Sequence, residues 1–344
     1  MKGGEVGMAN RNDVRIKSNE GRKYYNEIDC IKAITVIFVV LGHSFPDFEN
    51  GMRYKLALFI SRYCYSFHMG LFFMVSGFLV YRKFVSTDID MAKEIKKKFF
   101  RLMVPYLLYS FITFVIKIKL NAYANHAIDS NSIWKIFLGE SPNGSLWFLW
   151  TLFFVWLFVL LYSRFSKKIY PLVIIGVGLY VLTLFDSIGV MKNLCRYFSF
   201  YCIGLLIAHR YEDIKTILTM KWFPVIALII VGIFALAQTT GIIGEQFYLI
   251  SGLFGSYGIW AISYRERKEN RIIKLLSYYS YDIYLLSYFP QIFIRTLFDR
   301  IFDLNYIFTV VFMFLGGLIL PVAVSKFCLR RHMVLRKLFL GDVS

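Results

Sequence analysis

The strongest constraint on the fold of this chain is a series of apolar blocks, each roughly 17–22 residues long. A helix rises ~1.5 Å per residue, so a block of this length crosses the roughly 30 Å of hydrocarbon in a bilayer. Hydrophobic residues make up 58% of the chain and charged residues 18%. Soluble chains average about 45–50% and about 25%, respectively. We therefore predict an all-α integral membrane protein that forms a polytopic helical bundle.

About ten of these blocks are predicted to be transmembrane helices. They cover residues 30–47, 57–81, 102–119, 146–162, 169–185, 194–208, 222–238, 246–263, 279–297 and 305–325. With a cytoplasmic N-terminus, the cytoplasmic segments are 1–29, 82–101, 163–168, 209–221, 264–278 and 326–344. These segments hold 29 of the 40 Lys and Arg residues, as the positive-inside rule requires. The charge pattern therefore predicts ten helices with both termini in the cytoplasm.

This topology divides the chain into three parts. Residues 1–28 form a polar cytoplasmic N-terminal tail, residues 29–326 the membrane domain, and residues 327–344 a basic cytoplasmic C-terminal tail. The first apolar run follows the polar tail, so we expect a retained signal-anchor helix without a cleavable signal peptide. We expect a basic cytoplasmic loop at 82–101 and a polar, nearly uncharged external loop at 120–145.

The net charge and the cysteines exclude other classes of protein. The formal net charge is +18, but the basic residues lie between apolar blocks, which favours a lipid bilayer over nucleic acid as the partner. We expect a multi-pass protein of the cell membrane. The five cysteines are odd in number and lie in or next to apolar segments without metal-ligand spacing. They predict packing roles, with neither a disulfide framework nor a metal site.

The first apolar block carries ionisable residues on one helical face. It reads IDCIKAITVIFVVLGHS over residues 28–44. At ~100° per residue, Asp29, Lys32 and His43 share a face with Val36 and Val40. Lys32 and His43 are ~16 Å apart along the axis, and Asp29 is close enough to pair with Lys32. Ionisable residues in a membrane segment are functional candidates by default.

A structural interpretation of these residues stays open. Lys32 lies near the cytoplasmic end of the block and could extend to the lipid headgroups. Asp29 and His43 could be ordinary interfacial residues at the two ends of the block. The shared face favours function.

Five stretches give the chain a family resemblance. The I-D-x-x-K-x10-H pattern resembles acyltransferase family 3 membrane proteins, whose signature is Arg or Lys, ten residues and then His. Matching stretches follow in order: SFHMGLFFMVSGF at 66–78, KKFFR at 97–101 with Pro105, LWFL at 146–149, and SYDIYLLS at 280–287. The chain looks most similar to the fucose 4-O-acetylase-like branch. Gly70 stands where Pro is common, and Ser287 where many members have His.

The resemblance covers about residues 25–325 and implies an acyltransferase that transfers groups other than aminoacyl groups. It implies O-acetyl transfer from cytoplasmic acyl-CoA, here acetyl-CoA, to a hydroxyl of a cell-surface polysaccharide or glycolipid precursor. His43 would be the general base or a transient acyl carrier. Lys32, with Asp29 beside it, would contact the donor. Direct transfer and an acyl-enzyme intermediate both remain open.

The remaining candidates follow from what this reaction requires. Lys97, Lys98 and Arg101 could bind the phosphates of acyl-CoA, although any cytoplasmic loop is basic. A developing oxyanion needs a donor, and His68, Ser76, Tyr281 and Ser287 are second-tier catalytic or structural candidates. Polar groups in apolar helices also serve as interhelical hydrogen-bond partners.

The external loop supplies the candidates for acceptor binding. Trp147 could stack on a sugar at the external mouth, with Glu140 beside it, although interfacial aromatic belts also explain such tryptophans. His126, His209 and His332 are given no role.

Two other functions remain alternatives. A transporter or flippase of a lipid-linked sugar or small solute also fits ten helices and intramembrane charge, but we find no internal repeat of the kind typical of transporters. A membrane scaffold or sensor would leave the pairing of Lys32 and His43 unexplained. The oligomeric state, including a homo-oligomer, stays open.

Overall fold

The computed structural model describes residues 26–45, 52–119, 129–185, 191–266, 270–300, 302 and 305–342, and these residues form helices without β-strands. The larger helices are α1 (Asn26–Gly42), α2 (Met52–Tyr65), α3 (His68–Val85), α4 (Met91–Lys119), α5 (Trp147–Phe165), α6 (Tyr170–Leu182), α7 (Lys192–His209), α9 (Phe223–Thr239), α10 (Tyr248–Arg265), α11 (Arg271–Leu286), α12 (Tyr288–Arg300) and α13 (Tyr306–Phe327). Shorter ones are η3 (Ser130–Leu138), α8 (Tyr211–Thr219), η5 (Glu245–Phe247), η6 (Leu329–Arg331) and α14 (Met333–Leu340). The predicted N-terminal tail lies outside the described residues as far as residue 25.

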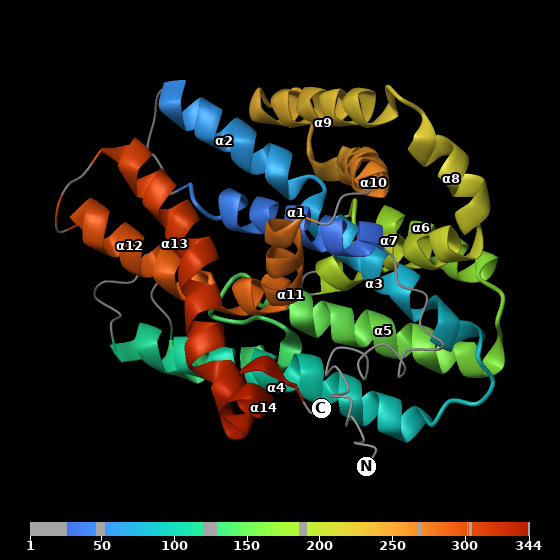
Figure 1. The fold of residues 1–344 in the computed structure, drawn as a ribbon, viewed down its shortest axis with the longest axis horizontal. Helices are drawn as coiled ribbons and strands as arrows, with labels where there is room; N and C mark the ends of the chain where they lie inside the picture. Colours follow the sequence, from blue (N-terminus) through green and yellow to red (C-terminus); the bar gives the residue numbers. More distant parts are fainter. Residues whose placement is uncertain are drawn as a thin grey trace, which may run out of the picture.

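Helix α1 lies in the middle of the bundle (Figure 1) and packs against α2, α3, α10, α11 and α13. Its side chains explain this position, because residues 33–42 are apolar except for Thr35. Ile31, Val36 and Val40 are fully buried. The helix that carries the predicted functional face is therefore a core element of the fold.

Helices α3 and α7 approach so closely that two glycines become necessary. A Cβ added at Gly77 would collide with the carbonyl oxygen of Tyr201, and one at Gly204 with that of Met74. Small residues at such contacts let helix backbones meet inside a membrane, where van der Waals packing replaces the hydrophobic effect. This contact fixes α3, and therefore the start of α3 near the site, relative to α7.

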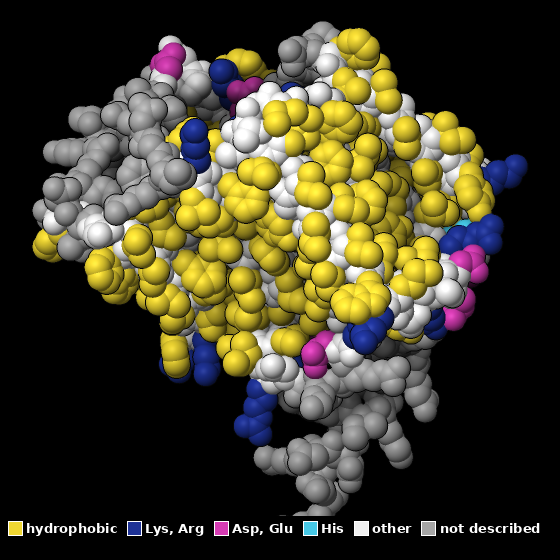
Figure 2. Space-filling view, turned by 90° about the horizontal axis from the view of Figure 1, so that it is seen from above, with side chains coloured by type: hydrophobic (Ala, Val, Ile, Leu, Met, Phe, Trp, Pro, Cys, Tyr) yellow, Lys and Arg dark blue, Asp and Glu magenta, His cyan; other side chains and the backbone are white. Residues whose placement is uncertain are grey.

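The exterior is strongly apolar. Figure 2 shows one face that is mostly hydrophobic, with Lys and Arg side chains along its borders. Helix α9 alone exposes Ile229 and Ile233 by 57% and 62%. Soluble monomers rarely expose continuous apolar patches of this kind. Within the described residues, four helices are long and apolar enough to cross a membrane, or five if the bent pair α8–α9 forms one span.

One predicted helix is not continuous in the structure. The predicted helix 279–297 is divided into α11 and α12 around Ser287. Pro290 lacks an N–H, and its ring would clash with the carbonyl of Leu286 in a continuous helix. The predicted helix 57–81 lies within one candidate membrane span, Tyr54–Val85. The regular helix has only a short turn at Ser66, whose hydroxyl donates to the carbonyls of Arg62 and Tyr63.

Two predicted cytoplasmic segments are also more helical than expected. The loop 82–101 is helical from Met91, because the Asp90 carboxylate accepts a hydrogen bond from the Lys93 amide at 3.0 Å and starts α4. The tail 327–344 contains α14, which packs against α4. Basic residues are good helix formers, so charge alone does not mark a loop.

Candidate active site

His43 follows the last residue of α1 and lies against a tyrosine from α2. Its amide still donates to the Val39 carbonyl at 3.2 Å, so the backbone continues the helical direction by one residue. The Tyr65 hydroxyl lies 2.7 Å from Nδ1 and 3.4 Å from Nε2 of His43. The two rings meet edge to face, with centroids 5.3 Å apart. His43 is half-buried.

A second histidine lies next to the same tyrosine. His68 opens α3 and is fully buried, with its ring centroid 5.1 Å from that of Tyr65. Its Nδ1 is 2.5 Å from the carbonyl oxygen of Cys64. Because a carbonyl can only accept, Nδ1 must carry the proton, and neutral His68 has its lone pair on Nε2. Among the described residues this Nε2 has no hydrogen-bond partner.

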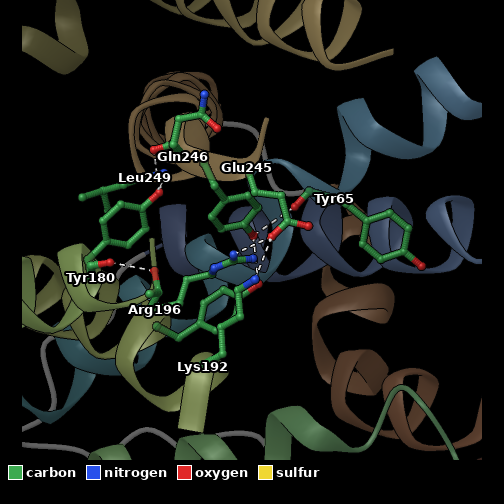
Figure 3. A network of polar contacts seen from close by, with 10 residues as sticks. Tyr65, Tyr180, Lys192, Arg196, Glu245, Gln246 and Leu249 are labelled. Carbon is green, nitrogen blue, oxygen red and sulfur yellow. Dashed lines mark hydrogen bonds and ion pairs between the residues drawn. The ribbon is translucent and has the colours of Figure 1, made fainter. Parts of the chain in front are cut away.

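A polar network supports the backbone of Tyr65 (Figure 3). The Tyr248 hydroxyl, from α10, lies 3.0 Å from the Tyr65 carbonyl and 3.0 Å from the Tyr197 hydroxyl. The Trp147 ring packs on Tyr197 at 4.9 Å. The predicted acceptor-binding tryptophan and the His43 cluster therefore belong to the same end of the bundle.

The same network contains a cation pair that shares one carboxylate. Arg196 and Lys192 on α7 both reach Glu245, at 2.7 and 3.6 Å (Figure 3). The hydrogen bond from Arg196 lowers the pKa of the Glu245 carboxyl. The Arg196 guanidinium also lies 5.0 Å from the Tyr248 ring. These contacts connect α7 to η5 and to Tyr248 at the start of α10.

Helix α12 holds the other side of the His43 segment. The amide of Gln291, which is only 4% exposed, donates to the Val40 carbonyl at 2.9 Å and to the Ser44 hydroxyl at 3.1 Å. Ser287, one turn earlier, is also buried. Ser287 therefore lies at the α11–α12 break, near the end of α1 that carries His43.

Lys32 lies at the opposite end of α1. Its ammonium is 3.5 Å from the Asp29 carboxylate, which also accepts a hydrogen bond from Ser277 of α11 at 2.7 Å. The predicted pairing of Lys32 and Asp29 is therefore present. Between Lys32 and His43, the face is covered, because Val36 and Val40 are fully buried in a cluster with α11 side chains. A packed row of side chains therefore separates the two ends of the face.

The predicted donor-binding residues lie at the Lys32 end but differ in what they contact. Lys97 is exposed, whereas the Lys98 ammonium lies 5.7 Å from the Trp156 ring. Arg101 donates to the Leu340 carbonyl at 2.7 Å and its guanidinium lies 4.0 Å from the Tyr281 ring. Arg101 therefore holds the end of α14, and Tyr281 belongs to this contact rather than to the His43 cluster.

The remaining candidates are dispersed. Glu140 is exposed and lies 3.8 Å from Lys135 in an ion pair. Ser76 is half-buried within α3, two turns from His68. Within the described residues, no group of three or more His, Cys, Asp or Glu is arranged to hold a metal.

The comparison with protein families decides the class. Residues 25–326 match the family described as an acyltransferase domain, acyltransferase family 3. The chain belongs to this acyltransferase family. A more distant relative is the nodulation protein NolL of Sinorhizobium fredii, 27% identical over 190 residues, or 54% of this chain and 49% of NolL. The chain thus spans about half the length of the curated relative it matches. No solved structure matches the chain.

In this member of the acyltransferase family, the cluster at the end of α1 brings together titratable and aromatic side chains. An imidazole can take the proton of an attacking hydroxyl. The fully buried His68 offers a second acceptor, and Trp147 an aromatic surface on the same end. Lys32 and the exposed Lys97 provide cations at the other end.

Two residues of this candidate site were missed from the sequence. Tyr65 directly precedes the SFHMGLFF stretch, so proximity to a motif was the signal that could have found it. Gln291 offered no signal, because it reaches α1 across 251 positions in the chain. Both were missed because contacts between distant segments do not follow from helical periodicity.

Proposed function

We propose that the protein is a membrane-bound O-acyltransferase that moves an acetyl group from cytoplasmic acetyl-CoA to a hydroxyl of a cell-surface polysaccharide or glycolipid precursor. The observation that carries the proposal is the position of His43, half-buried beside a tyrosine hydroxyl at one end of α1, in a chain of the acyltransferase family. We expect chemistry of the kind carried out by the fucose 4-O-acetylase-like branch, which the sequence motifs resemble.

The proposed reaction needs one base and one leaving thiolate. His43 takes the proton of the acceptor hydroxyl as its oxygen attacks the thioester carbonyl, and the protonated imidazole then returns a proton to the departing thiolate of CoA. In the alternative route, His43 first takes the acyl group itself and passes it to the acceptor. Both routes place His43 at the reacting atoms.

The donor is proposed to bind at the opposite end of α1. Lys32, Lys97 and Lys98 would contact the CoA phosphates, because ammonium groups bind phosphate oxygens. Arg101 would join them only by releasing the Leu340 carbonyl. Because α11 covers the row between Lys32 and His43, the pantetheine arm would have to pass beside α11 rather than along that row.

The acceptor is proposed to approach from the Trp147 end. Trp147 would stack on a sugar ring, with Glu140 on the same external segment. This arrangement corresponds to ten transmembrane helices with cytoplasmic termini in the cell membrane, the topology that the charge distribution supports.

The test is transfer of radiolabelled acetyl from acetyl-CoA to envelope glycan, using membranes that contain the full-length protein. We expect His43→Ala to lose at least about 100-fold in rate, the lower range for removal of a general base. His209→Ala is the matched control, because His209 is exposed at the far end of α7 and contacts Tyr81. Equal labelling by wild type and His43→Ala would reject His43 as the base. Protein-dependent solute flux without any labelling would favour the transporter.

A further inference from the structure

The contact between Tyr65 and His43 suggests a role for Tyr65, to which the proposed reaction assigns none. The hydroxyl approaches the edge of the imidazole and lies nearer Nδ1, at 2.7 Å, than Nε2, at 3.4 Å. A hydroxyl can donate one hydrogen and also accept. Tyr65 can therefore bind His43 in either its neutral or its protonated form.

Tyr65 is 36% exposed, and several contacts hold it. Its ring contacts both imidazoles, edge to face with His43 and tilted against His68. Its backbone carbonyl accepts the hydroxyl of Tyr248. It is also the last residue of α2, directly before the break that leads into α3. A tyrosine held in this way can fix the orientation of His43, whose own backbone leaves α1 at that point.

A base needs one ring nitrogen with a lone pair that faces the acceptor. A neutral imidazole carries its proton on only one of its two ring nitrogens. The hydrogen bonds of the ring decide which nitrogen carries the proton and which is left for the reaction. A partner that accepts from Nδ1 leaves Nε2 as the lone pair. When Nε2 takes a proton, the Nδ1–H bond to that partner becomes charge-assisted and stronger.

We propose that Tyr65 is a positioning residue for His43: its hydroxyl oxygen accepts the Nδ1 hydrogen, so that Nε2 is the nitrogen that takes the proton of the acceptor hydroxyl. This inference rests on the proposed function for its catalytic consequence, but not for the hydrogen bond itself. Tyr65 is not the base, since a tyrosine hydroxyl ionises near pH ~10. Among the described residues, the ionisable groups around the Tyr65–His43 pair are His68, Cys64, Tyr197 and Tyr248.

The kinetic test compares Tyr65→Phe with Tyr63→Phe in full-length protein in native membranes. Tyr63 lies on the same helix, is half-buried, and its hydroxyl contacts the Leu228 carbonyl at 3.4 Å. We expect Tyr65→Phe to lower kcat for acetyl transfer to envelope glycan by roughly 10- to 100-fold, the value of a hydrogen bond to a charged group. The KM for acetyl-CoA should not change. The acidic limb of the pH–rate profile should move to lower pH, because the protonated imidazole loses a partner.

The opposite result would overturn the proposal. If both variants lose similar activity with unchanged pH profiles, Tyr65 has only a structural role. A higher KM for acetyl-CoA with unchanged kcat would place Tyr65 in donor binding and would also contradict the proposal.

A second measurement does not depend on turnover. Nitrogen NMR of the full-length protein, labelled at histidine ring nitrogens and held in lipid nanodiscs, reports which ring nitrogen carries hydrogen. His43→Gln identifies the His43 signals among those of the five histidines. We expect wild type to carry hydrogen on Nδ1 and Tyr65→Phe to lose this preference. Identical spectra and titrations in the two proteins would refute the hydrogen bond. If wild type transfers no acetyl group, the proposed function fails, and this measurement still decides the role of Tyr65.

Discussion

The carboxylate of Asp282, fully buried in α11, accepts a hydrogen bond from the Arg330 guanidinium at 2.8 Å. Arg330 comes after α13 and also stacks on the Tyr278 ring, 4.3 Å from its centroid. The Ser325 hydroxyl donates to the same carboxylate oxygen. This contact joins α11 to the C-terminal end of α13. Since α11 also covers the row between Lys32 and His43, the ion pair helps to hold the wall of the candidate site.

Removing Arg330 should therefore destabilise the bundle. Breaking a buried ion pair from one side leaves an uncompensated charge and costs about 3–5 kcal/mol. We expect Arg330→Ala to lower the midpoint of thermal unfolding strongly in detergent or nanodiscs. The exposed neighbour Arg331 is the matched control, and Arg331→Ala should remain near wild type. Equal midpoints for the two variants would mean that the ion pair contributes nothing to stability.

The close contact of α3 and α7 predicts a large effect from a single methyl group. Gly77→Ala would place its Cβ against the Tyr201 carbonyl, a backbone atom that cannot move aside without shifting α7. Overpacking of this kind typically costs about 1–3 kcal/mol. Gly178→Ala is the control, because a Cβ there meets nothing within 4 Å. Thermal unfolding should separate the two variants, and a Gly77→Ala protein as stable as Gly178→Ala would contradict the contact.

Gln291 should matter for both stability and activity. Gln291→Ala removes the hydrogen bonds to the Val40 carbonyl and the Ser44 hydroxyl, and each hydrogen bond typically contributes about 0.5–1.5 kcal/mol. Because the acceptors are Val40 and Ser44, on either side of the His43 segment, acetyl transfer should also fall. Thermal unfolding and kcat should be measured on the same preparation. Loss of stability without loss of kcat would show that α12 does not position His43.

Lys32 should affect the donor rather than the chemical step. If Lys32 contacts CoA, Lys32→Ala should raise the KM for acetyl-CoA by roughly 10-fold, about the loss of one hydrogen bond to a charged group. It should leave kcat nearly unchanged, whereas His43→Ala lowers kcat. Lys215→Ala is the control for loss of a basic charge, because Lys215 lies on α8 and pairs with Glu212. A fall in kcat with an unchanged KM would remove Lys32 from the donor site.

The Glu245 carboxylate predicts a pH dependence of stability. Its pKa is lowered in the folded protein, chiefly by the hydrogen bond from Arg196. The stabilisation is therefore present at pH values above the ordinary glutamate pKa of about 4.3. It is lost as the pH falls through the lower pKa that Glu245 has in the folded protein. Glu245→Gln should unfold at a lower temperature than wild type at pH ~7, and the difference should shrink in acid. If the difference in unfolding temperature does not change with pH, the effect comes from the altered shape of the side chain and not from the loss of its charge.

Much of this architecture follows from local properties of the chain. The apolar blocks predicted an all-helical protein, and residues 26–42 and 147–165 form helices close to the expected places. The Asp29–Lys32 contact follows from i, i+3 spacing alone. The division of residues 279–297 was missed, although Pro290 carried a readable signal. Tyr65 and Gln291 were missed because their contacts with α1 join segments that are far apart in the chain.

The sequence by itself determined the helical class, the apolar exterior and the placement of Lys32 and His43 at opposite ends of one helix. Helix formation and the transfer of an apolar segment into lipid both depend on residues that are close together in the chain. Only the tertiary structure decided what each end contacts. It placed Tyr65 on His43, drew Gln291 to the end of α1 and covered the row between with α11. These contacts depend on how helices pack around small residues such as Gly77, and packing geometry is a property of pairs of surfaces that no single segment encodes.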